Sequence, residues 1–216
     1  MKTKFFSISA IFIFLTITLQ AQIGFGILGG INFQNLNGKN SSGYKLKNDL
    51  APGFHVGGNI QIQIAPDFFF QPGILFTTKG ANDNDASPSL KYRISYLELP
   101  LNMVYKGLLG KGYFMLGLGP YLGYGIGGKV KFDNGATSKI EFKNVVEANE
   151  TSMATFLRAF DAGGNIFVGY ELASRIFIQL NTQLGMLKIN PEDRRISNDI
   201  SSIKNTGFGF SVGYRF

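Results

Sequence analysis

The chain ends in the stretch Gly207-Phe208-Gly209-Phe210-Ser211-Val212-Gly213-Tyr214-Arg215-Phe216, in which every second residue is bulky and apolar. Side chains of a β-strand alternate between the two faces of a sheet, so the stretch predicts a strand with one apolar face. The other face carries only glycine, serine and arginine. A barrel strand that meets lipid on one side and a narrow polar interior on the other has this pattern.

The amino terminus predicts export from the cytoplasm. Lys2 and Lys4 precede an apolar run from Phe5 to Leu19, which stops at Leu19-Gln20-Ala21, a cleavage site of the secretory type. We interpret residues 1–21 as a signal peptide that is removed and residues 22–216 as one barrel domain. The alternative, an anchoring helix, fits less well, because the run is shorter than the ~20 apolar residues that span a bilayer.

The composition favours a membrane barrel. The chain has 28 glycines and 21 phenylalanines with only 16% charged residues, which is unusual for a soluble protein. No later segment is long and apolar enough for a spanning helix, so a mature chain that enters a membrane must do so as a closed barrel. The absence of cysteine excludes disulfides and thiolate metal sites. Lysine and arginine are scattered, with no run interleaved with aromatic residues, so we expect no nucleic-acid partner.

Eight segments have the alternation of strands. The clearest sets Phe54, Val56 and Ile60 against His55 and Gln61. In the fourth segment the apolar phase reverses near residues 96 and 97, which predicts either a β-bulge or a change of environment there. The eight segments cover residues 23–34, 53–64, 68–78, 92–105, 112–126, 156–172, 176–188 and 207–216.

The connections alternate between long and short. Residues 35–52, 80–91, 127–155 and 189–204 form long polar connections, and residues 65–67, 106–111 and 173–175 form short ones. Outer-membrane barrels have short periplasmic turns, long extracellular loops and an even number of strands. We therefore predict an all-β fold, an eight-stranded antiparallel up-and-down transmembrane β-barrel. The alternative is a soluble periplasmic barrel with its apolar face inward, but the face rich in Gly, Asn and Gln suits the interior of a narrow barrel.

The chain resembles the PorT-like outer-membrane β-barrel proteins of Bacteroidetes. The resemblance spans the mature chain and is clearest in Tyr96-Leu97-Glu98-Leu99-Pro100-Leu101, Leu116-Gly117-Leu118-Gly119-Pro120-Tyr121 and Asp161-Ala162-Gly163-Gly164-Asn165. It implies an eight-stranded barrel in the outer membrane of a Gram-negative bacterium. It also implies that the barrel-assembly machinery reads a carboxyl-terminal signal, made of Phe210, Val212, Tyr214 and Phe216. The family takes its name from a member linked to protein secretion and gliding.

We expect no catalytic residues, no cofactor and no metal. The stretch from Gly24 to Gly29 matches the dinucleotide fingerprint, but it continues as β alternation and not as a helix. His55 is the only histidine, so it would have to be the base of an enzyme that hydrolyses lipid acyl chains. No sequence spacing places a serine beside it, and we interpret His55 as an inward side chain bonded to polar neighbours.

Charges that face the interior need partners, because an isolated charge in a narrow lumen is costly. Glu171 and Arg215 both lie near the periplasmic ends of their strands, and we predict that they pair. Arg93, Arg158 or Arg175 would then meet the other acids. The predicted polar network of the lumen is Glu98, Asp161, Glu171, Arg215 and His55.

The sequence favours a non-enzymatic scaffold or a component of secretion or the envelope, acting through loops 127–155 and 189–204. The alternatives are a narrow porin-like channel and a lipid-modifying enzyme. The expected partners are outer-membrane lipid, lipopolysaccharide, the barrel-assembly machinery and envelope or secretion proteins. Arg194 and Arg195 are candidates for contact with lipopolysaccharide phosphates, with simple solvation as the alternative.

Overall fold

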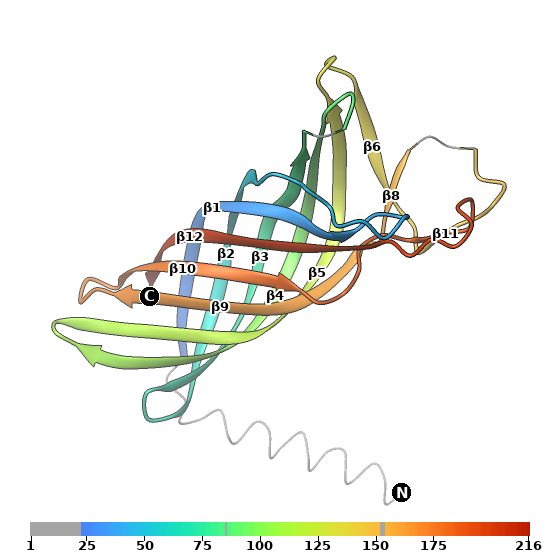
Figure 1. Cartoon of the computed structure of the whole chain (residues 1–216). Helices are drawn as coiled ribbons and strands as arrows, with labels where there is room; N and C mark the ends of the chain where they lie inside the picture. Colours follow the sequence, from blue (N-terminus) through green and yellow to red (C-terminus); the bar gives the residue numbers. More distant parts are fainter. Residues whose placement is uncertain (1–22, 85, 152–153) are drawn as a thin grey trace, which may run out of the picture.

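The computed structural model describes residues 23–84, 86–151 and 154–216 (Figure 1). The predicted signal peptide, residues 1–21, lies outside the described residues. In the part of the chain that is described, the regular structure consists of strands. No helix among these residues is long and apolar enough to cross a membrane.

Eight strands form a closed ring in which every neighbouring pair is antiparallel. The ring closes through the pairing of the first strand with the last and of the fourth with the fifth. The fold is thus the eight-stranded up-and-down barrel that the sequence predicts. In chain order the eight are β1 (Ile23–Lys39), β2 (Ala51–Ala65), β3 (Phe68–Asp83), β4 (Leu90–Leu109), β5 (Gly112–Phe132), β9 (Phe160–Glu171), β10 (Ile176–Gly185) and β12 (Ser202–Arg215).

Three tight turns join strands at one end of the barrel, and β1 begins and β12 ends at this same end (Figure 1). Each turn contains a residue with positive φ, namely Asp67, Gly110 and Arg175. These left-handed residues reverse the chain within two to four positions, which keeps the periplasmic end short. The longer connections all lie at the opposite, extracellular end.

The strands extend further toward the extracellular end than the sequence predicts. β1 continues to Lys39 and β5 to Phe132, and the predicted loop 127–155 contains β6 (Thr137–Phe142) and β7 (Val145–Val146). The predicted strand 156–172 is divided, because β8 (Thr155–Leu157) ends before β9 begins. The predicted loop 189–204 contains β11 (Glu192–Asp193), which pairs in parallel with β7. The loop assignment was wrong because the outward side chains here are polar, although inward ones such as Val130 and Ile140 are buried and apolar.

A β-bulge lies where the sequence predicts a bulge or a change of environment, but its extra residue, Ile126, belongs to β5 and not to β4. The register of β4 against β5 shifts between Ser95 and Tyr96. Tyr96 and Ile94 are both buried in the interior. The inward positions of β4 continue without a break through this point, since Ile94, Tyr96 and Glu98 are all buried. The reversed apolar phase of β4 therefore reflects a change of environment, from an apolar interior above to a polar interior below.

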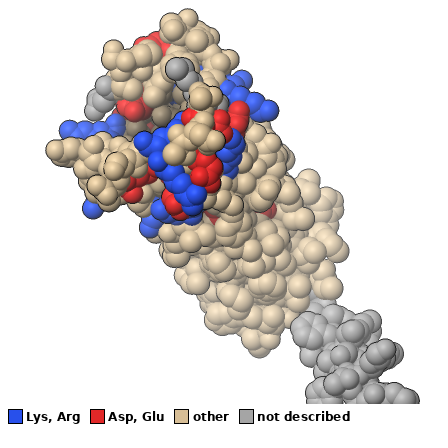
Figure 2. Space-filling view, turned by 90° about the vertical axis from the view of Figure 1, so that its right-hand side faces the viewer, with Lys and Arg blue, Asp and Glu red and all other residues tan. Residues whose placement is uncertain are grey.

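The two faces of the wall differ in chemistry, as the alternation predicts. Figure 2 shows the charged side chains gathered at the extracellular end, while the barrel wall in view is almost free of them. Large apolar side chains cover the outer wall, among them Phe25, Ile27, Ile31, Phe54, Val56, Leu97, Leu180 and Phe208. The inner face is buried and largely polar, with Asn32, His55, Asn59, Gln61, Gln71, Asn102, Asn165 and Gln179.

Two apolar clusters lie inside the barrel, one toward each end. The cluster toward the periplasmic end is formed by Val104, Met115, Phe167 and Phe177. The cluster toward the extracellular end is larger and is formed by Leu36, Ala81, Ile94, Tyr96, Val130, Ile140, Leu157 and Ile189. Polar residues of the lumen such as Asn32, His55 and Asn102 lie between these two clusters.

Candidate functional site

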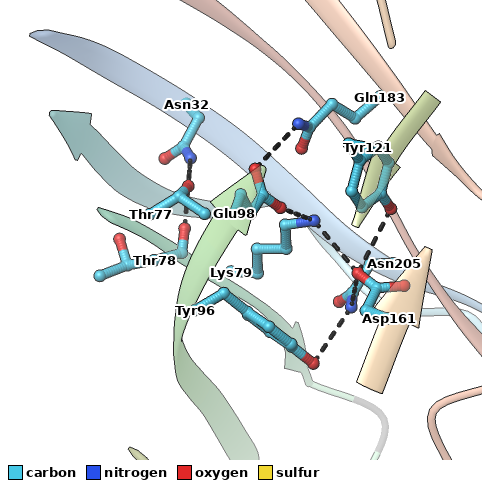
Figure 3. A network of polar contacts seen from close by, with 10 residues as sticks. All are labelled: Asn32, Thr77, Thr78, Lys79, Tyr96, Glu98, Tyr121, Asp161, Gln183 and Asn205. Carbon is cyan, nitrogen blue, oxygen red and sulfur yellow. Dashed lines mark hydrogen bonds and ion pairs between the residues drawn. The ribbon is translucent and has the colours of Figure 1, made fainter. Parts of the chain in front are cut away.

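A buried ion network crosses the lumen just below the extracellular apolar cluster. Lys79 of β3 forms ion pairs with Glu98 of β4 and Asp161 of β9, and the distance from Lys79 Nζ to Asp161 Oδ2 is 3.2 Å (Figure 3). All three side chains are fully buried. One ammonium group thus lies between two carboxylates, so the interior is charged but internally paired.

Side chains from three further strands extend the network. Tyr121 Oη and Asn205 Nδ2 donate to Asp161 Oδ2 over 3.3 and 2.9 Å, and Gln183 Nε2 donates to Glu98 Oε2 over 3.1 Å. The Lys79 ammonium also lies 4.3 Å from the centre of the Tyr121 ring. Together these residues come from six of the eight strands, β3, β4, β5, β9, β10 and β12 (Figure 3). They connect these six strands across the lumen.

A second ion network lies near the periplasmic end. The structure places Glu171 and Arg215 together inside the barrel, with Arg215 Nε 3.8 Å from Glu171 Oε2. Lys106 Nζ lies 2.7 Å from Glu171 Oε1. Arg215 Nη1 also donates to Asn59 Oδ1. Four strands therefore meet at this second network, β2, β4, β9 and β12.

The prediction that Arg93, Arg158 or Arg175 meets the interior acids was wrong. Arg93 donates to Asn82 Oδ1 and to the Tyr92 carbonyl, Arg175 is exposed on a turn, and none of the three forms an ion pair among the described residues. The cations are lysines instead. Lys79 lies one residue beyond the predicted third strand, which ends at Thr78, and Lys106 lies in a predicted turn, so alternation does not identify either lysine as inward.

His55 contacts a serine that the sequence spacing did not identify. His55 Nε2 lies 2.7 Å from Ser211 Oγ, which also accepts a hydrogen bond from Asn181 Nδ2 over 3.0 Å. β1 lies between β2 and β12, and Gly30 stands in register with both His55 and Ser211. A Cβ at Gly30 would lie 2.9 Å from the His55 ring. The glycine therefore lets the imidazole reach across β1 to the serine.

The cavity beside this pair is small. It has a volume of about 50 Å³ and is lined by His55, Ser211, Asn32, Gln179 and other polar side chains. A space of this size holds one or two water molecules and no acyl chain. Among the described residues His55 has no other side-chain hydrogen bond that would orient the imidazole. The geometry is that of a buried polar contact more than of a nucleophile and its base.

The four residues of the predicted assembly signal project outward from β12 and its end. Phe210, Val212 and Tyr214 are 40%, 45% and 39% exposed, and Phe216 is 62% exposed. The Phe216 amide donates to the Phe25 carbonyl over 2.8 Å, and its ring meets the Tyr214 ring edge-on. The terminal side chain is thus displayed on the outer wall beside the start of β1.

The extracellular loops are tied together by ion pairs. Arg194 lies 2.9 Å from Glu147 and 3.2 Å from Glu192, and thereby joins the segments of β7 and β11. Arg195 lies 2.7 Å from Asp193, and its hydrogen bonds hold the pKa of the Asp193 carboxyl below its usual value. Both arginines, which the sequence suggested for phosphate contact, are already paired with acids.

Comparisons with known proteins agree with this architecture. A family model described as "outer membrane protein beta-barrel domain" matches residues 20–191. Similar solved structures include Ail, the attachment invasion locus protein of Yersinia pestis, in complex with the heparin analogue sucrose octasulfate (14% identity, 90% of this chain and 99% of that chain, TM-score 0.42). Neisserial surface protein A is similar at 14% identity, over 89% of this chain and 97% of that chain, with a TM-score of 0.48.

Both TM-scores lie below 0.5, so the assignment depends on the barrel itself and on the family match. A search of curated proteins found no match. The family match covers most of the chain, including seven of the eight strands of the ring. Members of such a family reside in the outer membrane, which agrees with the apolar outer wall. The chain belongs to the outer membrane protein beta-barrel domain family.

Proposed function

We propose that this protein is a sealed outer-membrane barrel that acts without catalysis, as a scaffold that presents its extracellular strands and loops to another envelope component. The observation that supports this proposal is the doubly closed lumen. The fully buried network around Lys79 crosses the lumen, and the extracellular apolar cluster lies directly above it. A barrel whose lumen does not let solutes pass can bind partners only on its exterior surface.

Planar-bilayer recordings test the closed lumen. We expect the purified protein to give no conductance steps above the bare bilayer, because solutes would have to displace the buried ion network. Stable and reproducible steps from the unmodified protein would contradict the proposal and favour the narrow channel. A heat-unfolded sample of the same preparation serves as the control for contaminating porins.

We further propose that the protein is a PorT-like component of a Bacteroidetes envelope, exported by removal of residues 1–21 and assembled by the barrel-assembly machinery. The resemblance of the mature chain to that family supports this, and so does the outward display of Phe216. The partner surface would lie on the extracellular connections, where Tyr44 and Ile200 are 74% and 62% exposed.

Site-specific photo-crosslinking in cells tests the partner surface. A photoreactive residue at position 44 or 200 is expected to capture envelope proteins. The matched control is position 108, since Leu108 is also 74% exposed but lies at a periplasmic turn. Absence of adducts from both loop positions, or the same adducts from position 108, would contradict a scaffold that acts through its extracellular loops.

A lipid-modifying enzyme is the second candidate, and the contact between Ser211 and His55 is the observation that favours it. An acyl-hydrolase assay on phospholipid vesicles with Ser211→Ala decides between the two functions. The scaffold predicts no hydrolysis by either protein. Hydrolysis that is lost in Ser211→Ala would establish the enzyme instead.

A further inference from the structure

Five basic side chains form a patch on the outer face of the sheet just above the apolar wall. They are Lys91 and Arg93 of β4, Lys129 and Lys131 of β5, and Lys139 of β6. Their neighbours Ile94, Val130 and Ile140 are buried in the extracellular apolar cluster. Since side chains alternate along a strand, the five basic residues point to the outside. We call this set the cationic patch.

The strand register brings these like charges face to face. Lys91 is paired with Lys131, and Lys129 is paired with both Arg93 and Lys139. Directly opposed side chains on antiparallel strands have Cβ atoms ~4.5–5.5 Å apart, and like charges at such positions destabilise the sheet. Repulsion at three neighbouring pairs favours a bound anion that compensates for it.

No acid of the described residues forms an ion pair with the cationic patch, although the pKa of the Asp133 carboxyl is lowered by its hydrogen bond from Ser89 and also by the nearby charge of Lys91. None of its five members forms an ion pair, whereas Arg194, Arg195 and Lys143 of the nearby loops all do. The acids closest in the chain are Asp133 and Glu141. Asp133 accepts a hydrogen bond from Ser89 Oγ over 2.8 Å. The patch is thus a cluster of positive charges without ion pairs among the described residues of the extracellular end.

The position of the cationic patch next to the lipid-facing wall indicates that the anionic group belongs to a lipid. On the same outward face of β4, Leu97 is 48% exposed, and on β5 Tyr124 and Ile126 are 59% and 56% exposed. From Leu97 to Arg93 the wall changes from apolar to basic within about 13 Å of strand, at roughly 3.3 Å per residue. An apolar groove of about 330 Å³, lined by Leu97, Leu99, Leu122, Tyr124 and Phe160, lies directly below on the lipid-facing wall.

We propose that the cationic patch binds the phosphate groups of a phosphorylated glycolipid of the outer leaflet, with an acyl chain of the same lipid in the groove below. A phosphate between opposed lysines removes their repulsion, and its charge-assisted hydrogen bonds to ammonium groups are strong. The apolar groove favours a lipid as the ligand, because a free anion or a soluble polysaccharide has no acyl chain to bury there.

Binding of lipid A to the full mature protein in phosphate-free detergent tests the proposal. Native mass spectrometry would compare lipid A that carries its phosphates with the same lipid after dephosphorylation. The patch variant is Lys129→Gln/Lys131→Gln/Lys139→Gln. The matched control is Lys45→Gln/Lys47→Gln/Lys188→Gln, which removes the same charge from exposed loop lysines. We expect at least tenfold weaker binding of phosphorylated lipid A to the patch variant, wild-type binding to the control, and a similar tenfold loss for the dephosphorylated lipid.

Folding of the patch variant is checked by its mobility on an unboiled gel. Without lipid it is expected to unfold at no lower temperature than the wild type, because the like charges are gone. Equal lipid binding by the patch and control variants would overturn the proposal. So would complete competition by equimolar inorganic phosphate, which would indicate a free-phosphate site, or patch-dependent binding of a sulfated polysaccharide with unchanged lipid binding.

Discussion

Lys79 is the residue on which the closed lumen most depends. Its ammonium group is fully buried between Glu98 and Asp161, so Lys79→Met leaves two carboxylates without their cation. Removing one partner of a buried ion pair costs about 3–5 kcal/mol. We expect a loss of this size in the free energy of unfolding, measured by urea titration of the barrel in lipid vesicles.

The matched control for this prediction is Lys91→Met, which removes an exposed lysine that forms no ion pair among the described residues. The triple variant Lys79→Met/Glu98→Gln/Asp161→Asn is expected to regain part of the loss, because its carboxylates are neutralised together with the ammonium. If Lys79→Met unfolds at the same urea concentration as the wild type, the network does not stabilise the barrel.

Gly119 is required by the close approach of β4 and β5. A Cβ at this position would lie 2.1 Å from the Leu101 carbonyl oxygen, whereas a Cβ at Gly127 of the same strand meets nothing within 4 Å. Overpacking of this kind costs about 1–3 kcal/mol. We expect Gly119→Ala to lower the unfolding free energy by that amount and Gly127→Ala to change it little, by the same urea titration. Equal effects of the two substitutions would contradict the steric argument.

For single residues of the lumen, the sequence predicts which side chains face inward but not which of them contact one another. Alternation predicts that Glu98, Asp161 and His55 face inward, because it depends only on neighbours in the chain. The contact between His55 and Ser211 joins residues 156 positions apart, across an intervening strand. It depends on the registers of β1 with β2 and with β12, which one sequence does not supply.

At the scale of elements, the membrane-spanning halves of the strands were predictable and their extracellular halves were not. Within the membrane the outward residue must be apolar, so Phe54 and Val56 alternate clearly with polar neighbours. Above the membrane that requirement ends, and Lys129 and Lys131 face water on either side of buried Val130. A hydrophobicity pattern then indicates a loop where hydrogen bonding maintains a strand.

The pairing of β7 with β11 depends on Arg194, which contacts Glu147 and Glu192 at once. Arg194→Ala is expected to release this loop unit without changing the barrel, because exposed ion pairs contribute little to global stability. The measurement is amide hydrogen exchange, with faster exchange expected at Glu192 and Arg194, whose amides donate to carbonyls near β7. Lys188→Ala, an exposed loop substitution outside these pairs, is expected to leave exchange unchanged, and the same slow exchange in Arg194→Ala would contradict the prediction.

At the scale of the whole molecule, the wall, the lumen and the loops have separate tasks. The wall is apolar because it meets lipid, and the lumen can be polar because inward groups such as Lys79, Glu98 and Asp161 pair across a narrow space. The charges that remain are concentrated at the extracellular end (Figure 2). This division explains why the fold could be predicted from local alternation, while the partner, which depends on the surface of folded loops, could not.

Phe216, the last residue, allows a role in barrel assembly to be distinguished from a role in barrel stability. The Phe216 side chain is 62% exposed, and its backbone amide, not its ring, completes the bond to Phe25. Phe216→Ala is therefore expected to refold in detergent with the urea midpoint of the wild type. In cells, if the ring is read during assembly, the folded and heat-modifiable form in the outer membrane should fall several-fold. Leu108→Ala, which removes an exposed apolar side chain from a periplasmic turn, should leave both measurements unchanged. Normal assembly of Phe216→Ala would show that the terminal ring is not the signal, whereas a lowered midpoint would show that it stabilises the barrel itself.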